Sequence, residues 1–109
     1  MISDLKKLRV LFKELIDILE KENDREILYI INQLELGLHL INECLNSSYE
    51  NNDLKELNSK LKEIYKKINQ PQVGLSDFFI WRDNDEERLK ANMSLDTIKE
   101  NLSLIFNYN

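Results

Sequence analysis

Apolar residues recur at alternating steps of three and four along most of this chain of 109 residues. Such stripes predict amphipathic helices, because one helical turn takes 3.6 residues and residues three or four apart share a face. With only two Gly and one Pro, the composition favours helices and leaves few places for tight β turns. The pattern therefore predicts an all-α fold around one hydrophobic core.

Caps and helix breakers divide the stripes into separate helices. The expected boundaries are a first helix over 4–21, a second carried by 27–45, a third over 54–69 capped by Asp53 and ended by Pro71, a short helix from Asp83 or Asn84 to about Asn92, and a last helix from Ser94 to about Asn107. These lengths and connections predict an up-and-down bundle of four main helices plus a short helix. An irregular crossing joins the third and last helices, and residues 1–109 form a single domain.

Composition excludes several classes of protein. No apolar run approaches the 18 or so residues that a membrane span needs, and residues 1–9 lack the order of a signal peptide, so we expect a soluble, cytoplasmic protein. A single Cys44 and a single His39 give neither a disulfide nor a typical zinc site. A net charge of −5 and a pI near 4.9 oppose binding to nucleic acid. We expect no metal and no cofactor.

No catalytic signature is present. His39 lies in a predicted helix but is not followed by the Lys and small residue typical of phosphotransfer domains. The acidic run from Asp83 to Glu87 lacks the spacing and the Gly of a calcium loop, so a capped, solvated helix start is the simpler interpretation. Cys44 has no basic neighbour that would lower its pKa. The sequence therefore predicts a protein that binds rather than an enzyme.

Residues 74–87 are the most distinctive segment. They contain the only Trp and two of the four Phe, together with five carboxylates and one Arg. Two interpretations stay open for the run from Phe78 to Trp81, whose periodicity is too short to distinguish a strand from a helical turn. Its aromatics can plug the end of the bundle, or they can anchor a basic partner, since aromatics dominate interface energetics and acidic fields speed encounter.

A second acidic zone lies on the second predicted helix and the linker after it. No Lys or Arg occurs between Arg25 and Lys55, a stretch that includes Glu35 and Glu43. These charges can be solvated faces that keep a small domain soluble. A binding role requires both acidic zones to share one surface, where they would accept Lys and Arg side chains from a partner.

Three features together resemble small immunity proteins of bacterial polymorphic-toxin and contact-dependent growth inhibition loci. They are the motif Gly-Leu-Ser-Asp-Phe-Phe-Ile-Trp, the following Asp-Glu-Glu-Arg and the closing amphipathic helix, and the likeness covers mainly residues 74–106. The resemblance implies a cytoplasmic protein that binds the toxin domain encoded by a neighbouring gene and covers its active site. Many such toxins are cationic nucleases, so the resemblance implies acidic mimicry of phosphate.

The resemblance also implies which residues meet the toxin. The acids that would pair with its Lys and Arg are Asp77, Asp83, Asp85 and Glu86, followed by Glu35 and Glu43 on the second helix. Trp81 or Phe79 would be the apolar anchor. The alternative is a helical adaptor or regulatory protein that pairs through Leu-rich faces, as a homodimer or with another chain. A monomer favours the immunity interpretation.

Overall fold

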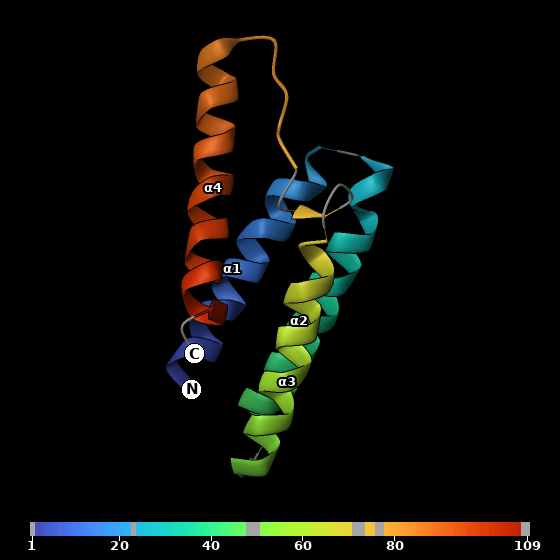
Figure 1. The fold of residues 1–109 in the computed structure, drawn as a ribbon, viewed down its shortest axis with the longest axis vertical. Helices are drawn as coiled ribbons and strands as arrows, with labels where there is room; N and C mark the ends of the chain where they lie inside the picture. The colour runs from blue at the N-terminus through green and yellow to red at the C-terminus, as the bar shows by residue number, and fades with distance from the viewer. Residues whose placement is uncertain (1, 23, 48–50, 71–73, 76–77, 108–109) are drawn as a thin grey trace.

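The computed structural model describes residues 2–22, 24–47, 51–70, 74–75 and 78–107, and it confirms the all-α bundle. The helices are α1 (Ile2–Glu20), α2 (Leu28–Asn46), α3 (Asn51–Ile68) and α4 (Asp85–Asn107), with a short 3-10 helix η1 (Arg25–Ile27) before α2. Among the described residues there is no strand. Helix α1 packs against both α2 and α4, while α3 packs against α2 (Figure 1).

The core forms where the predicted stripes meet. Phe12, Leu34, Leu61 and Leu95 come one from each helix, and each is almost completely buried. The burial of these apolar side chains provides most of the favourable free energy of folding, which offsets the loss of conformational entropy. The three-four spacing thus places one buried face on every helix.

Gly37 allows α1 and α2 to lie close together. A Cβ at Gly37 would stand 2.5 Å from Cε2 of the fully buried Phe12 ring. No rotamer change of a flexible chain end relieves that clash, because the ring is enclosed in the core. The small residue is therefore part of the packing of α1 on α2.

Two predictions about helix boundaries are wrong. Helix α3 begins at Asn51, so Asp53 lies inside its first turn rather than at the cap. Helix α4 is continuous from Asp85 to Asn107, so the short helix and the last helix are one, and Ser94 is an exposed residue in its middle. Propensity allows this, because Ser is only mildly unfavourable inside a helix and the buried face continues through Leu95 and Ile98.

The predicted cap at Asn84 is present, since its Oδ1 accepts from the Glu87 N–H at 3.1 Å. Pro71, the predicted end of α3, lies outside the described residues.

The molecule is elongated, with extents of 49 × 23 × 23 Å. The start of α1 and the end of α4 lie near one another, whereas the first turns of α4 rise beyond the end of α1 (Figure 1). Residues 78–84 run alongside these first turns as an extended stretch. The irregular crossing predicted between α3 and the last helix is therefore present, and it covers a part of α4 that the other helices leave free.

Candidate protein-binding site

Residues 78–82, which we call the aromatic segment, alternate between buried and exposed side chains. Ile80 is 2% exposed and Phe78 packs against the core, whereas Phe79 is 58% exposed and Trp81 is 65% exposed. Successive side chains of an extended chain point to opposite sides, which explains the alternation. Phe78 and Ile80 thus pack against the bundle, as the plug interpretation expects. Phe79 and Trp81 face solvent, and for these two residues the partner-anchor interpretation stays a prediction.

Side chains of α4 hold the backbone of the aromatic segment. Asn92 donates to the Ile80 carbonyl at 2.8 Å and accepts from the Ile80 N–H at 2.9 Å. Lys99 Nζ donates to the Phe78 carbonyl at 3.0 Å, and Arg88 donates to the Arg82 carbonyl at 3.2 Å. Arg88, Asn92 and Lys99 lie along one face of the helix at steps of four and seven. They supply partners to a stretch that has no neighbouring strand, and so keep buried backbone groups from going unpaired.

A salt bridge fastens the same segment to the end of α1. Arg82 donates two hydrogen bonds of 2.7 Å to the Glu22 carboxylate in a bidentate arrangement. The hydrogen bond from Arg82 lowers the pKa of Glu22, although partial burial opposes the shift. Charge-assisted pairs of this geometry fix orientation as well as adding energy. The aromatic segment is thereby attached to α4 through its backbone and to the turn after α1 through the Arg82 side chain.

Trp81 is positioned although it is exposed. The guanidinium carbon of Arg88 lies 4.6 Å from the centre of the Trp81 ring, a cation–π contact, and Trp81 Nε1 donates to Asp83 at 3.4 Å. Arg88 also pairs with Asp85. Two predicted site acids, Asp83 and Asp85, are therefore tied to the exposed indole, directly and through Arg88.

The structure brings five of the eight predicted site residues together. Phe79, Trp81, Asp83, Asp85 and Glu86 are all exposed on the aromatic segment and the first turn of α4. Asp77 lies outside the described residues. Leu89 and Met93 are also exposed on α4, and Met93 borders a hollow between α4 and α1.

The helix α2 acids do not join that group. Helix α2 has 19 residues and is about 28 Å long, and Glu43 lies in its last turn, at the end of the molecule opposite the aromatic segment (Figure 1). Glu35 is exposed in the middle of the same helix. The two acidic zones therefore do not form one continuous surface, so the shared surface that the charge pattern suggested is wrong. A single partner surface that uses both zones is excluded, and only the acids near the start of α4 lie next to the aromatic segment.

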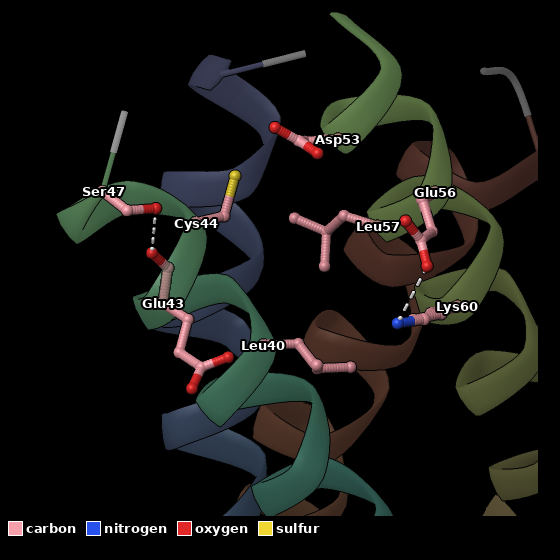
Figure 2. Close-up of a pocket in the computed structure, with 8 residues that line it drawn as sticks. All are labelled: Leu40, Glu43, Cys44, Ser47, Asp53, Glu56, Leu57 and Lys60. Atoms are coloured by element: carbon pink, nitrogen blue, oxygen red, sulfur yellow. Dashed lines mark hydrogen bonds and ion pairs between the residues drawn. The ribbon is translucent and has the colours of Figure 1, made fainter. Parts of the chain in front are cut away.

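Glu43 instead borders a groove of about 180 Å³ between α2 and α3 (Figure 2). Cys44, Asp53 and Glu56 also line it, and Leu40 and Leu57 form its apolar part. Glu43 pairs with His39 at 3.0 Å, and Glu56 pairs with Lys60 at 3.3 Å. Burial, followed by the charge of Asp53, raises the pKa of the Cys44 thiol. A thiol kept protonated in this way is a poor nucleophile.

The exposed rings and carboxylates of this arrangement can form apolar and ionic contacts. His39 is an exposed residue of an i, i+4 pair rather than part of a nucleophile–base pair. In the part of the chain that the structure describes, no three His, Cys, Asp or Glu side chains gather as a metal site requires. No described helix is long and apolar enough to cross a membrane.

Sequence reasoning missed the residues that hold the site. Arg88, Asn92 and Lys99 read as ordinary polar positions of a helix, and Glu22 is 60 residues away from Arg82. One signal was available for Asn92: it lies three positions before the buried Leu95, on the core-facing side of the helix, where a polar side chain needs a partner.

No family model matches the sequence, and no curated protein or solved structure matches it either.

Proposed function

We propose that this protein is an immunity protein, which binds a basic bacterial toxin domain, a cationic nuclease, through the aromatic segment and the start of α4. The observation that carries the proposal is the exposure of Phe79 and Trp81 on a backbone that α4 and α1 hold in place. Two large aromatics in water contribute little to the stability of the free protein. On a partner they become anchors, because buried aromatics supply a large share of interface energy.

Preorganisation strengthens this interpretation. A flexible loop loses conformational entropy when a partner orders it, and that loss weakens binding. Here the hydrogen bonds of Asn92 and the Arg82–Glu22 pair have already fixed the backbone, and Arg88 restrains the Trp81 ring. Binding therefore meets a smaller ordering cost than it would on a mobile loop.

The acids determine the charge of the partner. Asp83 bonds to the exposed indole, Asp85 is linked to it through Arg88, and Glu86 is exposed in the same first turn of α4. Exposed acids of this kind attract a cationic surface and increase the association rate more than they increase affinity. Mimicry of phosphate by these carboxylates agrees with a nuclease as the partner.

The test uses the toxin-like domain encoded by the gene immediately upstream, expressed in cells with and without this protein. We expect the protein to restore growth and to form a purified complex, and the double variant Phe79→Ala, Trp81→Ala to lose both. The matched control is Tyr29→Ala, Leu36→Ala, which removes exposed apolar side chains from α2. Equal protection by both double variants, or no protection by the wild-type chain, would refute the proposal.

A second candidate function rests on a different surface. Leu28, Tyr29 and Leu36 are exposed on the outer side of α2, and an apolar helix face can pair with a second copy or another helix. This surface supports the adaptor alternative. Light scattering separates the candidates: a stable dimer that the Tyr29→Ala, Leu36→Ala variant abolishes favours the adaptor, and a monomer favours the immunity protein.

A further inference from the structure

The hydrogen bonds of the aromatic segment fall on alternate residues. The carbonyls of Phe78, Ile80 and Arg82, and the N–H of Ile80, all have partners on α4. In an extended chain the N–H and C=O of one residue point to the same side, and those of the next residue point to the opposite side. These groups of the even-numbered residues therefore point toward α4, whereas the Phe78 N–H donates to the Leu75 carbonyl at 3.1 Å.

The opposite edge of the segment is open. Among the described residues, neither the N–H nor the C=O of Phe79 has a hydrogen-bond partner, and the same holds for the N–H of Trp81. The Trp81 carbonyl accepts one bond from Arg82 at 2.8 Å, which leaves its second lone pair. Phe79 and Trp81, whose backbone groups on this edge lack partners, are also the two residues with exposed rings. Such a row of donors and acceptors is a template for another strand.

We propose that the basic partner adds a short extended strand to this edge, pairing its backbone with Phe79 and Trp81. The inference rests on the proposed function and specifies how the partner is recognised. Main-chain hydrogen bonds then provide affinity, and side chains at alternate positions provide specificity, as in other strand-addition complexes. Antiparallel pairing is the more stable arrangement for a strand of this length.

The geometry also defines the partner sequence. Partner residues opposite Phe79 and Trp81 place their side chains on the same face as the two rings, where β-branched or aromatic groups pack well. The acids Asp83, Asp85 and Glu86 lie just beyond the carboxyl end of the segment. In an antiparallel pair, the partner's basic residues therefore come immediately before its pairing residues.

The experiment uses synthetic peptides and amide hydrogen exchange measured by NMR. The probe has two Lys followed by alternating Val and Thr, so that Val faces Phe79 and Trp81. In the free protein we expect slow exchange at the Ile80 amide and fast exchange at the Phe79 and Trp81 amides. With the peptide at millimolar concentration, exchange at Phe79 and Trp81 should slow by about tenfold or more, the range that one hydrogen bond provides.

Matched peptides isolate the backbone contribution. N-methylation of the Val residues blocks the paired edge and should abolish the protection, whereas N-methylation of the Thr residues modifies the outer edge and should preserve it. Equal effects of the two modifications, binding without protection at Phe79 and Trp81, or no binding by the unmodified peptide would each overturn strand addition.

The same exchange measurement on the complex with the toxin domain separates this inference from the proposed function. A stable complex whose Phe79 and Trp81 amides stay unprotected would refute strand addition alone. Peptide pairing without any protection of cells from the toxin would refute the immunity role and leave strand addition standing.

Discussion

Two ends of this molecule carry acid, and they differ in how that acid is used. At the α2–α3 end, Glu43 and Glu56 pair with His39 and Lys60 around a small groove, and none of the described residues that line this groove is aromatic. At the other end, Asp83, Asp85 and Glu86 are exposed just after Phe79 and Trp81 in the chain, and the rings of these two residues are exposed as well. Acidic residues are equally conspicuous in the two parts of the sequence, so charge alone does not distinguish them.

The distinguishing property is the support beneath the exposed groups. The aromatic segment receives hydrogen bonds from three side chains of α4 and a bidentate salt bridge from the turn after α1. The α2–α3 acids lie on regular helices that need no such support. We therefore place the proposed partner site at the aromatic segment, where hydrogen bonds and a salt bridge hold exposed apolar groups in position.

The largest expected effect is the difference in stability between variants of the buried and the exposed side chains of the aromatic segment. Ile80→Ala removes most of a fully buried side chain and should lower the free energy of unfolding by about 3 kcal/mol, through lost transfer energy and the cavity left behind. Phe79→Ala removes an exposed ring and should change it by less than about 0.5 kcal/mol. Urea unfolding of the two variants measures the difference. Similar losses in both would show that the alternation is wrong.

Asn92 is the next test, because it links the segment to α4. Asn92→Ala breaks three hydrogen bonds, two to Ile80 and one to the Arg88 carbonyl at 2.9 Å. It leaves the Ile80 backbone groups buried and unpaired, so we expect a loss of about 2 kcal/mol. Asn101→Ala, an exposed position on the same helix, is the control and should be nearly neutral. Equal stability of the two variants contradicts the proposed support.

A smaller effect compares the acids of the two ends in binding. Glu86→Gln removes a charge beside the aromatic segment, and it should slow association with the basic toxin domain a few-fold at low salt and less at high salt. Glu43→Gln removes the same charge from the opposite end and should leave the rate unchanged. Stopped-flow measurements over a salt series make the comparison. A rate reduced equally by both variants would indicate that only the net charge of the protein matters.

The smallest effect concerns the pH dependence of the Arg82–Glu22 bond. Because the folded pKa of Glu22 lies below its ordinary value of 4.5, the unfolded chain binds the proton first as the pH falls. The stability that this pair contributes is therefore complete above about pH 4.5 and is lost as the pH falls from there through the lowered folded pKa. Unfolding measured across this range in wild type and Glu22→Gln tests it. The variant should show the shallower decline, and identical curves would remove Glu22 as a contributor.

The helices were predictable from the sequence, but the side chains that hold the aromatic segment were not. Stripes of apolar residues give the helices because their period is a local property, as the buried faces of α1 and α3 confirm. The helix start predicted at Ser94 was wrong, because a residue type that favours helix caps is a weak signal when the buried face of the helix continues past it. The alternation of residues 78–82 depends on α4 side chains located 6 to 21 positions later, which no local pattern encodes.

The five predicted residues that gather at the start of α4 were found for a local reason as well. They are neighbours in sequence, and an exposed segment keeps sequence neighbours close in space. Glu43 failed to join them because its placement depends on the direction in which α2 runs, which separates it from the aromatic segment by most of the length of that helix. Charge counts along a chain contain no information about that direction.

Trp81 fluorescence tests the central claim most directly, since Trp81 is the only Trp in the chain. In the free protein its emission should be red-shifted and readily quenched by acrylamide, as expected of an indole that is 65% exposed. On addition of the toxin domain, the emission should shift to the blue and quenching should fall several-fold. A complex that forms while the emission and quenching of Trp81 stay unchanged would show that the partner binds elsewhere, and would contradict the account.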